Sequence, residues 1–346
     1  MNPAVWAILV STLSTSTIIT MSSHHWMLAW LALELNTLSI LPIIMKPHHP
    51  RATEATTKYF LIQTTAAALI LFASTLNAWE SGQWTITHPA STLSSTITLS
   101  AIMLKLGIAP AHLWYPDIIQ GTSMLTALTL TTWQKLAPIA LLYLTINHTS
   151  KPILMLMGLL SVLIGGWAGL NQTQTRKIMA FSSIAHMGWL IIALTLNPQL
   201  ATLTLTTYLL MTITMFLSLN ITTTKTLQDL GTAWSYSPTL SATTFMTLMS
   251  LGGLPPLTGF MPKLLILKEL TLAGLTPMST MLALLTLPSL YFYTRMAYFT
   301  IITTPPNTTP TTQKWRLKTN QKLSPALIAP TATLLLPLTP LLYVTY

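Results

Sequence analysis

The sequence predicts an all-α, polytopic membrane protein with about eleven transmembrane helices. Only 6% of its 346 residues are charged and 51% are hydrophobic, which leaves too little polar surface to solvate a soluble domain. Apolar stretches recur along the whole chain, and each is long enough to cross a hydrocarbon core of roughly 30 Å. Threonine is abundant in these stretches, where its hydroxyl can bond a carbonyl one turn back in the helix.

The predicted helices follow one another with short polar connections. Two are interrupted, and the connection 303–322 is rich in proline, threonine and asparagine, which is typical of a solvent-exposed loop. In order, the predicted helices cover residues 3–21, 26–45, 56–79, 92–119 (interrupted), 122–146, 152–170, 177–196, 199–222, 239–272 (interrupted), 276–303 and 323–345.

The two interruptions share a motif. Leu106 to Pro110 and Leu251 to Pro255 both read Leu-Gly-x-x-Pro, and a further proline follows each, Pro116 and Pro262. Proline removes a helical hydrogen bond and glycine loosens the backbone, so both stretches should be broken helices with unpaired carbonyls. They lie five helices apart and therefore run in opposite directions, as in an inverted repeat. Two chance kinks would explain the motif equally well, but the lysines beside the breaks, Lys105 and Lys263, favour the repeat.

This repeat predicts a division into three parts. Residues 1–147 form a first five-helix membrane repeat, residues 148–304 a second, and residues 305–346 a basic loop with a final transmembrane helix. Positive residues gather in the loops on one side of the predicted membrane, which places the N-terminus on the positive, cytoplasm-equivalent side and the C-terminus opposite. The positive residues in these loops are Lys46, Arg51, Lys58, Arg176, Lys177, Lys225, Lys314, Arg316, Lys318 and Lys322.

Four ionisable residues lie inside or beside the apolar stretches: Glu34, Lys105, Lys135 and Lys263. A charge at bilayer depth is costly, which marks a functional site. Burial stabilises the neutral form of an amine and a neighbouring carboxylate stabilises its charged form, so a buried lysine can carry a proton. Glu34 and Lys105 would form a modulating pair if their helices pack together. Lys135 would be the central station, and Lys263 a terminal one.

Each candidate also has a plainer interpretation. Lysines near helix ends usually extend their amines to the membrane interface, but Lys135 has more than ten predicted helical residues on either side. His112 and His186 are candidate relay residues, although an interhelical hydrogen bond explains His186 equally well. Arg295 is interpreted as an ion-pair partner or a headgroup anchor. Gly165 and Gly169 fit close helix packing rather than a dinucleotide site.

Several chemistries are excluded by composition. The chain has no cysteine, so thiolate metal sites, thiolate-held iron–sulfur clusters and disulfides are absent. The pairs His24-His25 and His48-His49 point to different faces at helix ends and are interpreted as loop residues, not metal ligands. The net charge of +10 is spread over loops, so we expect no nucleic-acid partner. The first apolar stretch lacks the features of a cleaved presequence, and we expect it to be retained.

Three segments together resemble the antiporter-like proton-translocating subunits of respiratory complex I. They are Lys105 to Asp117 (KLGIAPAHLWYPD), Ser182 to Gly188 (SSIAHMG) and Leu251 to Lys263 (LGGLPPLTGFMPK). The resemblance runs from roughly Trp26 to Arg295. In that family a glutamate pairs with a lysine on a broken helix, a second lysine follows, and a third charged residue sits on the second broken helix. Glu34, Lys105, Lys135 and Lys263 match these roles.

The resemblance implies proton translocation across the mitochondrial inner membrane, with the N-terminus in the matrix and the C-terminus in the intermembrane space. It implies no cofactor in this chain, while NADH, FMN, iron–sulfur clusters and ubiquinone belong to partner subunits. The implied partners are other complex I subunits, among them the antiporter-like subunit 4 and subunit 4L, together with accessory subunits and membrane lipids. Longer family members have three more helices at their start, a flank that lipid or accessory subunits would seal here.

Two alternatives remain at this point. Relatives that share these helices and lysines are stand-alone cation/proton antiporters. The chain could also act chiefly as a structural bridge with a silent proton path.

Overall fold

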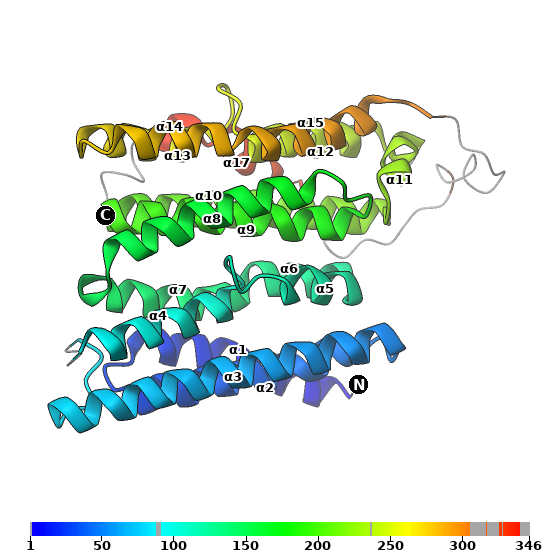
Figure 1. The fold of residues 1–346 in the computed structure, drawn as a ribbon. Helices are drawn as coiled ribbons and strands as arrows, with labels where there is room; N and C mark the ends of the chain where they lie inside the picture. Colours follow the sequence, from blue (N-terminus) through cyan, green and yellow to red (C-terminus); the bar gives the residue numbers. More distant parts are fainter. Residues whose placement is uncertain are drawn as a thin grey trace. The chain divides into compact units, whose positions relative to one another are not determined.

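A computed structural model describes residues 2–87, 91–235, 237–304, 316, 325–326 and 328–339. Throughout these residues the regular structure is helical, apart from two isolated β-bridges, which confirms the all-α class for the described part (Figure 1). By its contacts the chain divides into two compact units, Met1–Met157 and Gly158–Tyr346. Most of the predicted loop 303–322 and both ends of the predicted helix 323–345 lie outside the described residues.

In unit 1, α3 and α7 make most of the connections between helices. Helix α3 packs against α2, α4 and α5, and α7 packs against α1, α2, α4 and α6. The helices are α1 (Pro3–Ser22), α2 (Trp26–Met45), α3 (Pro50–Ser81), α4 (Thr92–Leu106), α5 (Trp114–Gly121), α6 (Met124–Thr131) and α7 (Trp133–Thr145), followed by the short 3₁₀ helix η1 (Ile146–His148).

In unit 2, α9 forms the core: within its most apolar 18 residues, 94% are buried. It packs against α10, α13 and α15, and α12 packs against both α10 and α15. The elements are α8 (Lys151–Gly169), which begins just before the unit boundary, α9 (Thr175–Leu196), α10 (Pro198–Thr222), α11 (Leu227–Gly231), η2 (Ala233–Ser235), α12 (Pro238–Gly252), α13 (Phe260–Leu272), α14 (Thr276–Leu285), α15 (Leu287–Ile301), α17 (Ile328–Leu334) and η4 (Leu336–Leu338).

Small residues allow α8 and α9 to approach closely. A Cβ at Gly165 would lie 2.7 Å from the amide nitrogen of Ala185, and one at Gly169 would lie 2.9 Å from the ring of Phe292 on α15. Both contacts confirm that these glycines serve helix packing.

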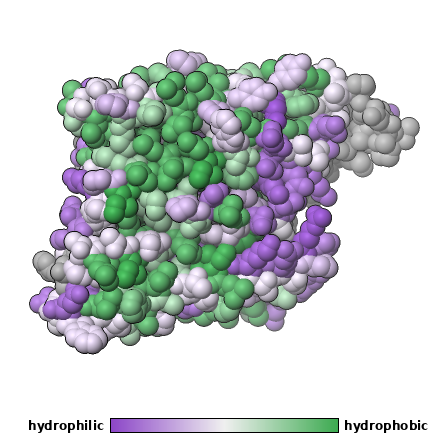
Figure 2. All heavy atoms as spheres, viewed as in Figure 1, coloured by the Kyte–Doolittle hydropathy of each residue, from purple (hydrophilic) through white to green (hydrophobic). Residues whose placement is uncertain are grey.

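Within the described part of the chain, six helices are long and apolar enough to cross a membrane by themselves: α1, α2, α3, α8, α9 and α10. Apolar side chains make up much of the face shown in Figure 2. On α2 the exposed leucines Leu28, Leu31, Leu35 and Leu38 recur every three or four residues and form one stripe, as expected of a face that meets lipid or a partner helix. The total of eleven spans and the inverted repeat stay predictions.

The structure contains both predicted interruptions. Helix α4 ends before Gly107, whose φ is +68°, and α12 ends before Gly253, whose φ is +82°. These backbone angles favour glycine because it lacks a Cβ. In each case six residues separate that glycine from the next helix, α5 or α13.

Two further interruptions were not predicted. The stretches 122–146 and 276–303 were expected to be continuous helices, but the structure divides them at Thr132 and Thr286. The Leu128 carbonyl accepts both the hydroxyl and the amide of Thr132, at 2.7 and 3.0 Å, and α7 begins at the next residue. Pro288 has no amide hydrogen for the carbonyl four residues earlier, so the helix restarts there.

Candidate functional site

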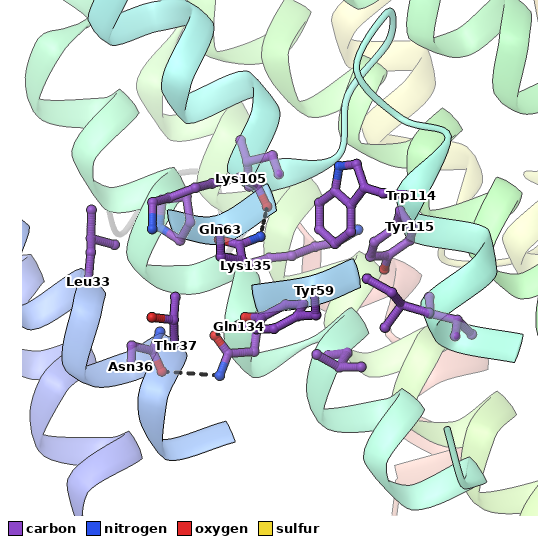
Figure 3. A pocket seen from close by; sticks show the side chains of 15 residues that line it. Leu33, Asn36, Thr37, Tyr59, Gln63, Lys105, Trp114, Tyr115, Gln134 and Lys135 are labelled. Atoms are coloured by element: carbon purple, nitrogen blue, oxygen red, sulfur yellow. Dashed lines mark hydrogen bonds between the residues drawn. The ribbon is translucent and has the colours of Figure 1, made fainter. Parts of the chain in front are cut away.

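Lys105 and Lys135 line the same enclosed cavity in unit 1 (Figure 3). The cavity offers about 20 Å³ to the centres of water-sized molecules, enough for roughly one or two waters. Helices α2, α3, α4, α5, α6 and α7 all contribute to its walls. The lining residues are Leu33, Asn36, Thr37, Tyr59, Gln63, Lys105, Leu106, Trp114, Tyr115, Ile118, Ile119, Leu130, Gln134, Lys135 and Pro138.

Lys135 is almost fully buried on α7, with 3% of its surface exposed. Its Nζ lies 4.7 Å from the centre of the Tyr115 ring, where the negative face of the ring attracts an ammonium group. Helix α7 begins only two residues before Lys135. The unexpected interruption at Thr132 therefore sets the position from which this lysine enters the cavity.

Lys105 is also buried, in the last turn of α4. Its Nζ and the Glu34 Oε2 atom are both buried, and neither has a hydrogen-bond partner among the described residues. The Glu34 carboxylate nevertheless interacts electrostatically with Lys105. Lys105 Nζ and Glu34 Oε2 therefore do not form a contact ion pair, and α3 packs against both of the helices that carry them. The modulating role of the pair stays a prediction.

Neutral polar side chains form hydrogen bonds within the walls of the cavity. Gln134 donates to the Asn36 side chain at 3.1 Å, and Tyr59 donates to Gln134 at 3.5 Å. Gln63 donates to the carbonyl of Lys105 at 3.5 Å (Figure 3). None of these four residues was among the candidates predicted from the sequence. The asparagine and the two glutamines could have been found from the sequence, because burying a side-chain amide in an apolar stretch of membrane length costs free energy unless it has a hydrogen-bond partner.

His112 lies in the break between α4 and α5 and is 8% exposed. Its Nδ1 is 3.1 Å from the Pro110 carbonyl, and a carbonyl can only accept, so Nδ1 carries the hydrogen. In the neutral ring Nε2 is then the proton acceptor. His112 is not among the residues that line the cavity.

In unit 2, Lys263 on α13 reaches back to the end of α12. Its Nζ donates to the Gly252 carbonyl at 2.9 Å and to the Leu251 carbonyl at 3.4 Å. These carbonyls are left unpaired by the helix break and carry the negative end of the helix dipole. A Cβ at Gly253 would lie 3.0 Å from this Nζ, so glycine also makes room for the lysine.

His186 lies on α9 in unit 2, with its ring 5.7 Å from that of Tyr208 on α10 and 6.5 Å from that of Tyr293 on α15. The two candidate residues of unit 2 therefore lie on different helices: Lys263 on α13 and His186 on α9. These two helices pack against each other.

Arg295 corrects a sequence interpretation. It was expected to form an ion pair or to anchor a headgroup, but Nη1 donates to the Leu170 carbonyl at 2.5 Å and Nη2 to the Gln172 carbonyl at 2.6 Å. Arg295 thus caps the C-terminal end of α8 from α15. A planar guanidinium suits two carbonyls at once, and a helix C-terminus favours a cation.

Replacing Arg295 with methionine should destabilise unit 2. The carbonyls of two half-buried residues would lose charge-assisted bonds, and a hydrogen bond to a charged group contributes about 1.5–3 kcal/mol. We expect a lower melting temperature and less assembled protein in native membranes. Lys268→Met is the matched control, because Lys268 is exposed on α13. Equal stability of the two variants would contradict the capping role.

The histidine pairs lie at helix starts, as expected. The Nδ1 atoms of His25 and His49 accept the backbone amides of Met27 and Arg51, both at 3.2 Å, and so cap α2 and α3. Among the described residues no group of three or more histidine, aspartate or glutamate side chains could hold a metal ion. The absence of a cofactor from this chain stays a prediction.

A helical bundle with two broken helices and two buried lysines that line one cavity is typical of the class of antiporter-like membrane proteins. The family model described as NADH:quinone oxidoreductase/Mrp antiporter, transmembrane region, matches residues 23–288, and that of the NADH dehydrogenase subunit 2 C-terminus matches residues 290–343.

Similar proteins agree with these models. NADH-ubiquinone oxidoreductase chain 2 from Carassius auratus is 54% identical over 98% of both chains, and that from Gallus gallus is 52% identical over 99% of both. A chain of respiratory complex I from Thermus thermophilus has a TM-score of 0.84 at 26% identity, covering 98% of this chain and 80% of that one. The chain therefore belongs to the NADH-ubiquinone oxidoreductase chain 2 family.

Proposed function

We propose that this chain is a membrane subunit of respiratory complex I that moves protons across the mitochondrial inner membrane while partner subunits pass electrons from NADH to ubiquinone. The observation that carries the proposal is the small cavity that Lys105 and Lys135 share. If both amines contact water in this cavity, they can exchange a proton without the proton passing through lipid. Membership of the chain 2 family supports the assignment to complex I.

The direction of transfer would be controlled by charge. A carboxylate at Glu34 would favour the ammonium form of Lys105, and any change in the distance between the two groups or in the protonation of Glu34 would alter that preference. Moving one charge against 100 mV costs about 2.3 kcal/mol, which is the scale of such interactions. In unit 2 the carbonyls at the end of α12 would stabilise the ammonium form of Lys263, with His112 and His186 as relays in their units.

A common register supports the proposal that the two units are inverted repeats. Gly107 and Gly253, the glycines that end α4 and α12, are 146 positions apart, as are Trp114 and Phe260, where α5 and α13 begin.

In this register the residue equivalent to Lys263 is Asp117, not Lys105. Asp117 is half exposed and lies 3.4 Å from Lys58. The two units would then have the same backbone conformation at the break, but the lysine would precede the break in unit 1 and follow it in unit 2.

The orientation of the chain in the membrane and its neighbouring subunits are proposed from its family and from the positive residues of its loops. We propose that the N-terminus faces the matrix, because the positive loops mark that side, and that the C-terminus faces the intermembrane space. Subunit 4 and subunit 4L are the proposed neighbours, with FMN, iron–sulfur clusters and quinone held in partner subunits.

Gentle extraction and native electrophoresis test the assignment. We expect the chain to migrate in a very large assembly that oxidises NADH in the gel, with other complex I subunits identified by mass. Migration as a small particle without this activity would replace the proposal with a stand-alone cation/proton antiporter. The fold alone allows that reading, since a chain of the Mrp complex from Dietzia sp. has a TM-score of 0.78 at 16% identity, covering 86% of this chain and 61% of that one.

A further inference from the structure

The break between α12 and α13 contains a single polar side chain. Residues 254–259 read Leu-Pro-Pro-Leu-Thr-Gly, so Thr258 is the one residue of this break whose side chain can donate a hydrogen bond. It is 2% exposed, and burying a hydroxyl is costly unless it has a partner. The proposed function does not yet use this residue.

The Thr258 hydroxyl binds the C-terminal helix α17. It donates to the carbonyl of Ala332, which is one of the last four residues of α17, and the helix itself offers no partner for these carbonyls. Helix α17 also packs against α10 and α12. Thr258 lies in the region that matches the antiporter model, and Ala332 lies in the region that matches the subunit 2 C-terminus. The bond therefore joins the C-terminal segment to the second break.

The break in unit 1 has its polar side chain at the same position. In the common register of 146 positions, Thr258 is equivalent to His112, which is likewise the only polar residue among the six of its break. The Nδ1 atom of His112 bonds the Pro110 carbonyl within that break, whereas the Thr258 hydroxyl bonds a different helix. The register thus pairs an internal restraint in unit 1 with an external one in unit 2.

The shape of the second break determines where the Lys263 amine lies. Lys263 follows the break, but the carbonyls of Gly252 and Leu251 that accept its amine precede it. Two of the six residues of the break are prolines, which have no amide hydrogen with which to fix the backbone. The bond from Thr258 to α17 adds a restraint five residues before the lysine.

We propose that Thr258 is a positioning residue: through its bond to Ala332, α17 holds the break in the shape that keeps the Lys263 amine at the Gly252 carbonyl. This inference rests on the proposed function, in which Lys263 carries protons. Without the bond the break would be free to change shape, and the amine would spend less time at the end of α12. Fewer protons would then pass through Lys263 for each NADH oxidised.

Thr258→Val tests the bond because it keeps a branched side chain and removes the hydroxyl. We expect the complex to assemble and oxidise NADH, while protons moved per NADH in proteoliposomes fall toward the ratio of a Lys263→Ala complex. Thr258→Ser retains the hydroxyl and should keep the unmodified ratio. Thr271→Val is the matched control and should also keep it, because Thr271 is exposed on α13 and its hydroxyl donates to the Lys268 carbonyl of its own helix at 2.7 Å.

A double variant separates positioning of the lysine from a general structural effect. If Thr258 acts through Lys263, Thr258→Val combined with Lys263→Ala should have the ratio of Lys263→Ala alone. A further fall in the double variant, or an equal fall in Thr258→Ser and Thr258→Val, would overturn the positioning role.

The remaining outcomes distinguish this inference from the proposed function. If Lys263→Ala lowers the ratio and Thr258→Val does not, the positioning role is overturned and the proposed function stands. If neither lowers it, the proposed role of Lys263 fails as well. Loss of assembly in Thr258→Val would also overturn the positioning role, because the bond would then be needed for the fold itself.

Discussion

Complex I that carries Lys135→Ala is expected to move markedly fewer protons per NADH oxidised. Lys135 is 3% exposed and shares its cavity with Lys105, so its removal would leave Lys105 without an exchange partner. Proton movement into sealed vesicles, measured together with NADH oxidation, gives the ratio. An unchanged ratio in fully assembled complex would remove Lys135 from the path.

Two further variants separate charge from proton transfer. Lys135→Arg keeps a positive charge facing Tyr115 but cannot release its proton near neutral pH, so its ratio should fall as far as that of the alanine variant. Lys151→Ala should keep the normal ratio, because Lys151 is exposed at the start of α8. Normal pumping by the arginine variant would mean that Lys135 acts as a fixed charge.

Gly259→Ala is expected to have the largest structural effect. Gly259 precedes α13, and a Cβ there would overlap the carbonyl oxygen of Ser250 on α12. Because the obstructing atom belongs to the backbone, the two helix ends must separate, at a cost of about 3 kcal/mol or more. We expect little assembled protein on native gels, and in any that assembles, Lys263 would lose its bond to Gly252.

Gly252→Ala is the control for this clash. Gly252 is helical, and its nearest obstacle is the Tyr293 Cβ at 3.9 Å, an ordinary contact distance. This variant should assemble normally. Equal assembly of the two alanine variants would show that α12 and α13 are not packed as closely as the structure has them.

Much of the fold could be predicted because its causes are local. Hydropathy identified the long helices, and glycine and proline identified the breaks at Gly107 and Gly253. The interruptions at Thr132 and Thr286 were missed. Thr132 has no proline or glycine beside it, and Pro288 permits either a kink or a new helix start.

The candidate residues were predictable for a similar reason: a charge stands out in an apolar stretch. The sequence singled out Glu34, Lys105, Lys135 and Lys263 without indicating what surrounds them. Their roles in proton transfer stay proposals.

The sequence by itself determined the class of protein, its long helices, its breaks and its buried charges, since each depends on side chains within a turn or two of one helix. Only the tertiary structure decided that Lys105 and Lys135 share a cavity, that Arg295 binds carbonyls at the end of a helix 125 residues earlier, and that the His186 ring lies near those of Tyr208 and Tyr293. In a membrane nearly every helix face is apolar, so periodicity does not encode which faces meet. Partners across helices are chosen by close packing of the whole bundle.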